Sequence, residues 1–491
     1  MKSMLFLLFL GCVLYFQPTA SEYVRGCYYT DWSQHRSKSA TFLPEDIDPF
    51  LCTHVLFAFA LINRTTLTLT IKENNDHDLY RRINALKKIN PKLKTQLSVG
   101  GWGQDQKDSP FSKMVATKEK RAIFIKSSID TLRKFAFDGL DLDWEYPGMG
   151  GGSPKSDVER FTLLCNELRA AFEAEAIISG KERLLLTAAV AAKFWVVEEA
   201  YDIAGIAVPL DWINLMTYDF HGLSDNKTGH HTAMGPDGDK LTVPFAAWYW
   251  MNSRRIWEKP GIMDGMPANK IVLGLATYGR SFGLANPSIH GLGAPRDFQY
   301  TPKGQYLGAV GVLAYYEICK RGLTVVEKNK AMAPYGHKDK DWVGFDNPKS
   351  LIYKIDNVLK ENSLRGVMFW ELGLDDFSGQ HCGQGKYPLM NAVKKYLTSG
   401  VQPPPVTTPP RPPAVTTQAP PPPPDTTQAP PPPPVTTTPP PPVSPTTGGG
   451  GGGPGGKCVA TGVWEGNAGM DAWCASNCAN GNCPSSHCKC N

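Results

Sequence analysis

Eight strand-like segments separated by helical stretches dominate residues 21–400. Most of these segments are short runs of β-branched or aromatic residues bounded by glycine, as buried strands are. Helical patterns such as Lys118–Phe135 and Val158–Ala176 lie between them. The predicted strands are Tyr23–Thr30, Thr53–Ala60, Thr95–Gly100, Gly139–Glu145, Leu184–Val190, Trp212–Tyr218, Ile271–Tyr278 and Gly366–Trp370.

This alternation constrains the fold, because it is typical of parallel sheets with helices on the outside. Eight such units predict the α/β class and, within it, a (β/α)8 TIM barrel over residues 21–400. The interval between the seventh and eighth strands is unusually long. It leaves room for a small α+β insertion near residues 283–345.

Residues 1–20 have the pattern of a secretory signal peptide. Lys2 supplies the positive charge, Leu5–Phe16 the apolar stretch and Ala20 the small residue before cleavage. A membrane anchor is the alternative, but the apolar run is short for a bilayer and no later segment is long and apolar enough to span one. We therefore expect a secreted, extracellular protein without a membrane partner, whose cysteines can form disulfides.

Composition changes sharply near residue 400. Residues 401–456 are rich in Pro, Thr and Gly, which cannot form a packed core, so we expect an extended linker. Residues 457–491 contain six cysteines, which predict a module with three disulfides in an undetermined pairing. Zinc binding is the alternative, but the ligand-pair spacing is absent. Trp464 and Trp473 form either a small core or a contact surface for a polymer, and the architecture favours a carbohydrate-binding module.

The segment FDGLDLDWEYPG, residues 137–148, places carboxylates inside an apolar run. Because alternate residues of a strand share a face, Asp141, Asp143 and Glu145 should point into the barrel and the apolar residues between them toward the helices. Successive carboxylates would lie ~6.6 Å apart, so at least one proton should be retained and shared. Glu145 ends the strand, where barrel enzymes keep their chemistry, and a raised pKa there would suit a general acid.

Three other interpretations of this segment are possible. A calcium-binding loop also alternates acidic residues, but it needs a glycine turn and oxygen-rich neighbours instead of Leu and Trp. An Asp-x-Asp metal site and a purely structural buried network are the other two. The surrounding sequence argues against all three, and we expect neither a metal nor a cofactor.

The motif DGLDLDWEYP resembles the signature of glycoside hydrolase family 18, the chitinases and chitinase-like lectins. The resemblance extends over residues 22–396 and implies the barrel fold predicted above. Further motifs resemble those of the animal chitinases in the same order: CYYTDW (27–32), AFA (58–60), SVGGW (98–102), MTYDFHG (216–222), YGRSF (278–282), LAYYEIC (313–319) and VMFWEL (367–372).

The resemblance implies a role for four residues. Glu145 matches the acid that protonates the glycosidic oxygen, and Asp143 matches the residue that holds the acetamido group of the substrate. Asp141 matches the deeper partner that shares its proton, and Tyr218 the tyrosine that hydrogen-bonds the acetamido group. This family uses no enzyme nucleophile, because the acetamido oxygen of the sugar attacks its own anomeric carbon.

A sugar cleft lined by aromatic rings is also implied by the resemblance. Trp370 matches the platform beneath the sugar at the point of cleavage. The other implied contact residues are Tyr28, Trp32, Phe59, Gly100, Gly101, Trp102, Gly103, Tyr146, Met216, Thr217, Asp219, Tyr278 and Arg280.

The cysteines of the predicted barrel fit the same resemblance. Cys27 with Cys52, and Cys319 with Cys382, match the disulfides of the family. Cys165 is left over, and its apolar helical setting predicts a buried thiol.

Two departures from the family pattern concern the cleft. Gly103 stands where many members have Asn, and Leu223-Ser224 stands where many have a Trp soon after the Phe-His-Gly motif. Both could weaken a flanking subsite and change where the chain is cut.

We expect a secreted, monomeric, endo-acting chitinase that binds chitin polymer and chito-oligosaccharides. The formal net charge is only +5 over 491 residues and no dense basic stripe is present, so we expect no nucleic acid partner. A non-catalytic chitin-binding lectin is the main alternative, but such lectins typically lose the acid that Glu145 matches. An exo-acting enzyme is a third possibility, although a linker and tail suit a polymer better.

Overall fold

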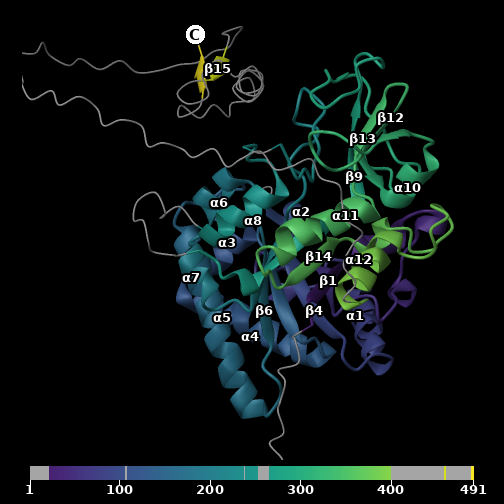
Figure 1. Ribbon diagram of the computed structural model, residues 1–491. Helices are drawn as coiled ribbons and strands as arrows, with labels where there is room; N and C mark the ends of the chain where they lie inside the picture. The colour runs from purple at the N-terminus through teal and green to yellow at the C-terminus, as the bar shows by residue number, and fades with distance from the viewer. Residues whose placement is uncertain are drawn as a thin grey trace, which may run out of the picture. The chain divides into compact units, whose positions relative to one another are not determined.

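The computed structural model describes residues 22–105, 108–236, 238–252, 265–399, 458–460 and 488–490. The chain divides into two units, Met1–Gly400 and Val401–Asn491. The first contains a barrel of eight parallel strands in the order β1-β14-β8-β7-β6-β5-β4-β2, closed by pairing of β1 with β2 (Figure 1). The barrel strands are β1 Val24–Thr30, β2 His54–Ile62, β4 Lys94–Gly100, β5 Gly139–Asp143, β6 Leu185–Val190, β7 Trp212–Leu215, β8 Ile271–Ala276 and β14 Gly366–Trp370.

All eight predicted strands are present, and the predicted TIM barrel is confirmed. Three of the strands end earlier than expected: the ladder of β5 stops at Asp143, that of β7 at Leu215 and that of β8 at Ala276. Glu145 and Tyr218 therefore follow their strands and are not part of them. Both residues therefore lie just beyond the carboxyl ends of their strands, on the side of the barrel where loops carry function.

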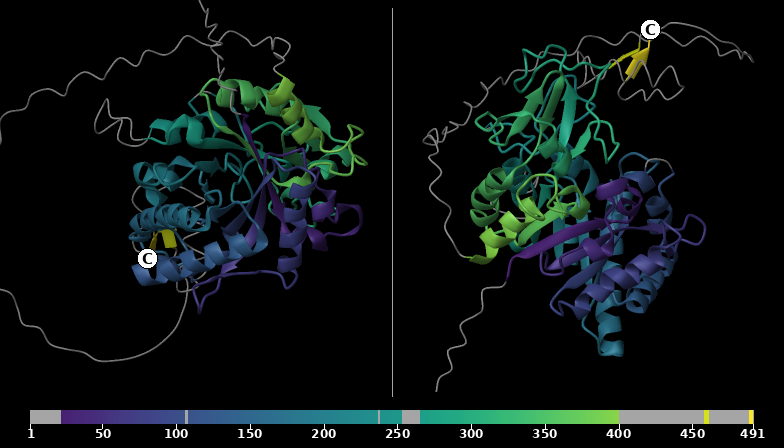
Figure 2. Two further views of the ribbon diagram at one scale, coloured as in Figure 1. Left: turned by 90° about the horizontal axis from the view of Figure 1, so that it is seen from below. Right: turned by 90° about the vertical axis from the view of Figure 1, so that its right-hand side faces the viewer.

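Helices surround the strands (Figure 2). The helix α4 spans Lys118–Phe135 as predicted, because Thr117 caps its first turn and Ala136 ends it in a left-handed conformation with φ of 62°. The helix α5, Asp157–Ser179, runs beyond its predicted ends. The other α-helices that the structure describes around the barrel are α1 Asp76–Ala85, α2 Trp102–Asp105, α3 Pro110–Val115, α6 Phe194–Ala200, α7 Ile203–Ala207, α8 Val243–Asn252, α11 Pro348–Lys354 and α12 Pro388–Ser399.

The predicted insertion lies between β8 and β14. It is an antiparallel sheet in the order β10-β9-β13-β12-β11 with one helix, α10, and it begins at Tyr278, earlier than expected. A small core of its own contains Phe282, Tyr335 and Trp342. Its elements are β9 Tyr278–Gly283, β10 Val312–Ala314, α10 Tyr315–Lys320, β11 Thr324–Val326, β12 Tyr335–Lys338 and β13 Asp341–Gly344.

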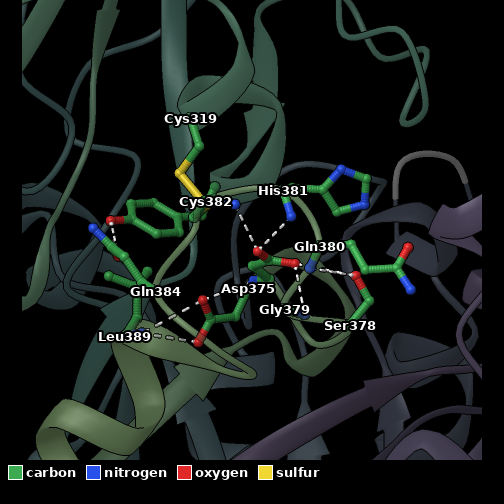
Figure 3. Close-up of a disulfide and its surroundings, with 11 residues drawn as sticks. Cys319, Asp375, Ser378, Gly379, Gln380, His381, Cys382, Gln384 and Leu389 are labelled. Atoms are coloured by element: carbon green, nitrogen blue, oxygen red, sulfur yellow. Dashed lines mark hydrogen bonds between the residues drawn. A yellow bond between two sulfur atoms is a disulfide. The ribbon is translucent and has the colours of Figure 1, made fainter.

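Both disulfides implied by the family resemblance are present, Cys27–Cys52 and Cys319–Cys382. The second joins helix α10 of the insertion to the loop after β14 (Figure 3). A buried carboxylate, Asp376, supports that loop by accepting the backbone N–H of Cys382 at 2.8 Å. Among the cysteines that the structure describes in the barrel, Cys165 is free and buried, as predicted.

Of the second unit, the structure describes only strands β15 Cys458–Ala460 and β16 Cys488–Cys490, which pair antiparallel. The predicted signal peptide, the linker, Trp464 and Trp473 lie outside the described residues. Within the described ranges, none of the helices combines the length and apolar composition that crossing a membrane requires.

Candidate active site

The strand β5 separates its polar and apolar side chains as its sequence predicts. Leu140, Leu142 and Trp144 are buried, and the Trp144 ring stacks on Phe111 of α3 with ring centroids 5.0 Å apart. The Asp141 side chain points to the opposite face of the strand, where it accepts hydrogen bonds from side chains of other barrel strands. The apolar face of the strand therefore packs against the helices, and the acidic face points into the barrel interior.

Asp141 is fully buried and accepts hydrogen bonds from four side chains. Its neighbours in the strand register, Ser98 on β4 and Thr187 on β6, donate at 2.7 and 2.6 Å. Tyr28 on β1 donates through its hydroxyl at 2.8 Å, and Asn214 on β7 donates through its amide at 3.0 Å. Each carboxylate oxygen thus accepts two of these hydrogen bonds.

Burial raises the pKa of Asp141 above its usual value, and the hydrogen bonds from Thr187, Ser98 and Tyr28 oppose that rise. The pKa of the Tyr28 hydroxyl is raised well above its usual value by burial and by the nearby Asp141. Tyr28 therefore stays protonated and donates. The result is a carboxyl group locked in position beneath the next acidic residue of the strand.

Two cavities of about 640 Å³ each are lined by Glu145. Glu145, Trp102 and Trp370 line both, so these residues form the shared wall. The first cavity is also lined by the predicted residues Asp143, Tyr146, Met216, Tyr218, Asp219, Tyr278 and Arg280. The second is lined by the predicted residues Trp32, Phe59, Gly100 and Gly103.

Four predicted site residues line neither cavity. Asp141 and Tyr28 lie beneath the cleft in the hydrogen-bonded cluster described above. Thr217 is buried and donates its hydroxyl to the Gly274 carbonyl at 2.7 Å, which ties the end of β7 to β8. Gly101 has φ of 80°, and a side chain there would collide with the ring of Phe59. These four residues lie behind the residues that line the two cavities and support them.

The Trp370 ring lies within a group of aromatic residues. Its centroid is 5.2 Å from that of Tyr28, 5.8 Å from that of Phe59 and 6.3 Å from that of Trp32. The register between β2 and β4 shifts between Ala58 and Ala60, so Phe59 is the extra residue of a bulge. A bulge redirects a side chain, and here Phe59 lines the second cavity.

Asp219 is held in the first cavity by a cluster of charges. Its backbone is left-handed, with φ of 58°. Tyr278 donates to its carboxylate at 2.6 Å, Arg280 binds both oxygens, and the buried His231 lies 3.6 Å away. Burial alone would raise the pKa of Asp219, but His231 and Arg280 hold it well below its usual range. Asp219 is therefore an anion with its side chain 40% exposed to the cavity.

Gly103, which stands where many family members have Asn, leaves open space in the second cavity. A Cβ atom at this position would meet no atom within 4 Å. The departure at Leu223 and Ser224 lies in the wall of the first cavity. Lys193 and Trp195 are among the residues of that wall that the sequence predictions missed. Their place directly after β6 was the available signal, because the loops that follow barrel strands carry function.

The sequence profile of the glycosyl hydrolases family 18 matches residues 24–375. The protein belongs to this family. Mouse chitotriosidase-1 is 46% identical over 378 residues, which cover 76% of this chain and 77% of that protein.

Solved structures of family 18 proteins are similar over the same region. The chitinase of Trichuris suis superposes with a TM-score of 0.69 and 36% identity, covering 77% of this chain and all of that one. Human YKL-39, described as a pseudo-chitinase with retained chitooligosaccharide binding, has a TM-score of 0.69 and 39% identity over 76% of this chain and 99% of its own. Membership of the family therefore does not by itself decide whether a protein hydrolyses its ligand.

Proposed function

We propose that the protein is an endo-acting chitinase that hydrolyses β-1,4 bonds between N-acetylglucosamine units. The position of Glu145 carries this proposal, because it lines both cavities and so leaves room for sugar units on both sides of a bond beside it. An enzyme that cuts within a chain needs space in both directions. Trp370, in the same shared wall, offers a flat ring to a sugar.

The proposed reaction has two steps, and the substrate supplies the nucleophile. The acetamido oxygen attacks the anomeric carbon while Glu145 gives its proton to the leaving oxygen, so the glycosidic bond breaks and an oxazolinium ion forms. Water then attacks the same carbon and displaces the acetamido oxygen, Glu145 takes a proton from that water, and the configuration is retained. General acid catalysis of this kind contributes about 10²–10⁴-fold to the rate.

The residues around Glu145 have the chemistry that this route needs. Asp143 and Tyr218 line the first cavity, where the carboxylate would orient the acetamido group and the phenol would donate to its oxygen. Burial raises the pKa of Tyr218 well above its usual value, with nearby Tyr278 and Asp143 adding to the rise, so the phenol keeps its proton. In the proposed mechanism, Asp143 and Asp141 share one proton.

A chitin-binding lectin is the second candidate function, favoured by the similarity to the pseudo-chitinase YKL-39. The same cleft would then bind oligosaccharides without cutting them. The presence of Glu145 in the shared wall supports the enzyme over the lectin, because a proton donor is of no use to binding alone.

Hydrolysis of chitopentaose by the purified protein tests this proposal. We expect the wild type to release shorter products from within the chain and Glu145→Gln to lose about 10²–10⁴-fold in kcat, because the amide has no proton to give. Calorimetry should show that Glu145→Gln still binds the pentamer. Binding by the wild type without any hydrolysis would favour the lectin, and normal turnover by Glu145→Gln would exclude the mechanism.

The proposed function also includes the residues outside the barrel. We propose that the protein is secreted, acts as a monomer on chitin and its oligosaccharides, and carries a carbohydrate-binding module at 457–491. The division of the chain into two units at residue 400 supports a barrel joined to a separate C-terminal unit. Tethering on a polymer raises the local concentration of the barrel at the surface.

A further inference from the structure

A positively charged side chain lies on an aromatic ring in the wall of the second cavity. The Lys72 ammonium is 4.2 Å from the centroid of the Trp32 ring, and both residues line this cavity and not the first. The motifs that resemble the family do not include Lys72. Because a cation is attracted to the face of an aromatic ring, the two side chains form one surface of the cavity.

Asp31, which precedes Trp32 in the chain, holds the Lys72 ammonium in place. Lys72 donates to Oδ1 of Asp31 at 2.8 Å, and Asp31 is completely buried. The Oδ2 atom of Asp31 is also buried, without a hydrogen-bond partner in the described part of the chain. The Lys72 side chain, in contrast, is 31% exposed. The pair therefore presents its cation to the cavity and keeps its carboxyl group in the core.

The segment that carries Lys72 is anchored on both sides. It follows strand β3 (Leu69–Thr70), which pairs antiparallel with β2. The buried Asp76 of α1 accepts the backbone N–H groups of Lys72 and Glu73, each at 2.8 Å. Because the backbone is fixed, the ammonium is in position before a ligand binds, and less entropy is lost on binding.

The second cavity differs from the first in charge. Among the described residues that line the second cavity, the ionisable side chains are those of Arg64, Lys72 and Glu145. Arg64 pairs with Asp108, whose side chain is 58% exposed, so solvent screens that pair. The first cavity contains two carboxyl groups in addition to Glu145. Lys72 therefore sets the charge that a ligand meets beside the Trp32 ring.

The pair keeps its positive charge at acid pH. Burial raises the pKa of Asp31 to about 6, the hydrogen bond from Lys72 opposes that rise, and the nearby Asp76 and Glu73 add to it. A protonated Asp31 can still accept the hydrogen bond from Lys72, but it no longer compensates the ammonium charge. The cavity thus stays cationic at acid pH, where the amines of deacetylated sugars are protonated.

We propose that Lys72 is a specificity-determining residue of the second cavity, which accepts an N-acetylated sugar unit beside the Trp32 ring and rejects a unit with a free, protonated amine. This inference rests on the proposed function. The ammonium would donate to an acetamido or hydroxyl oxygen of the sugar and would repel a second ammonium at the same place. The proposed mechanism needs one acetamido group, at the cleavage point, so Lys72 adds an independent requirement at another unit.

Digestion of partially acetylated chitosan, with the products sequenced by mass spectrometry, tests this selectivity. We expect wild-type products to be acetylated at the cut and, at one further position on one side of the cut, to be enriched about tenfold in acetylated units, equivalent to about 1.4 kcal/mol. Lys72→Met should remove the second enrichment and keep the first, because it removes the charge and keeps a long, unbranched side chain. Lys72→Arg, which keeps the cation, should retain both.

Lys72→Met leaves the buried Asp31 without its charged partner, so the double variant Asp31→Asn, Lys72→Met, which removes both charges, is measured beside it. It should show the same loss of the second enrichment. The matched control is Lys126→Met in α4, because this lysine pairs with Asp130 at 2.6 Å and lines neither cavity. It should give the product pattern of the wild type. An unchanged second enrichment in the double variant, or a wild type without that enrichment, would overturn the inference.

Binding measured in the Glu145→Gln background separates this inference from the proposed function. A hexamer with a glucosamine unit at each end should bind about tenfold more weakly than the fully acetylated hexamer, and added Lys72→Met should remove that difference. This result would support the selectivity whether or not the wild type hydrolyses. If Glu145→Gln does not bind the acetylated hexamer, the proposed function fails and the selectivity with it. A sulfated hexasaccharide that binds more tightly than the acetylated hexamer, and loses this advantage in Lys72→Met, would assign the cation to an anionic chain and overturn the inference.

Discussion

The carboxyl group of Asp141 is enclosed by donors from β1, β4, β6 and β7. A buried carboxylate is costly unless hydrogen bonds replace its lost hydration, and each hydrogen bond to a charged group contributes about 1.5–3 kcal/mol. Four donors lower the cost of an anionic Asp141 under the cleft, although burial still raises its pKa, so in the proposed mechanism it can share a proton with Asp143. Asp141 is therefore a positioning residue in the proposed mechanism and has no contact with the cleft itself.

Ser98→Ala tests this role, because it removes one donor from Asp141 and deletes only the hydroxyl oxygen. We expect kcat to fall by about tenfold, which corresponds to the loss of a hydrogen bond of about 1.4 kcal/mol. Since a lost donor destabilises the anion, the pKa of Asp141 should rise further, and the acidic limb of the kcat profile should move to higher pH.

The control for this variant is Ser128→Ala, which removes an equally buried serine in α4 that bonds only to the Phe124 carbonyl. It should leave the pH profile of kcat in place. A Ser98→Ala profile that overlays the wild type would show that Asp141 does not act through its charge.

Helix α11 is anchored by a buried ion pair. Lys354, at its last position, binds Asp346, which precedes the helix, and both side chains are almost completely buried. Asp346 also accepts the hydroxyls of Thr232 at 2.8 Å and Ser350 at 2.6 Å. The pair therefore ties α11 to the segment that follows β7.

Removing one partner of a buried pair leaves the other charge without compensation. We expect Lys354→Met to lower the free energy of unfolding by about 3–5 kcal/mol, measured by urea denaturation. Lys349→Met on the same helix removes an ion pair to Glu327 in which Lys349 is 80% exposed, and its effect should stay within about 0.5 kcal/mol. Equal effects of the two variants would contradict this account.

At the scale of the whole molecule, His230 connects the barrel to the insertion. Its Nε2 donates to the Pro334 carbonyl at 2.9 Å, and its Nδ1 accepts the backbone N–H of Thr232 at 3.2 Å. This assignment follows from the partners and describes a neutral ring. Burial, with the neighbouring His231, lowers the pKa of His230 to about 3, while Asp346 and Lys354 act in opposite directions.

This low pKa makes the stability of the protein depend on pH. Below about pH 6.5, His230 of the unfolded chain takes up a proton. In the folded protein the same imidazole stays neutral until the pH falls to about 3. The contribution of His230 to the free energy of unfolding is therefore fully present above pH 6.5 and is lost as the pH falls. The contribution amounts to about 2 kcal/mol between pH 6.5 and 5.

His230→Gln tests this dependence, because its amide can keep the bond to Pro334 but does not titrate. We expect the variant to be less stable at pH 7 and to lose less stability than the wild type between pH 6.5 and 5, measured by thermal unfolding. Parallel curves for the two proteins would assign the acid sensitivity to other groups.

Local patterns in the sequence determined the elements and the family motif. Alternation at a period of two in residues 139–145 defined an acidic and an apolar face, and the spacing of strands and helices predicted the barrel. These predictions were possible because they depend on neighbouring residues only. The disulfides and the role expected of Glu145 came from the resemblance to family 18.

Only the tertiary structure decided which distant residues meet. Asn214 and Thr187 bond to Asp141 because register brings separate strands together, and no pattern along the chain encodes that register. Trp195 lines the first cavity from α6, the helix that follows β6, beside Tyr218 from the segment after β7. Closure of the barrel sets these distances, and a closed barrel depends on contacts between residues hundreds of positions apart, such as those of β1 with β14.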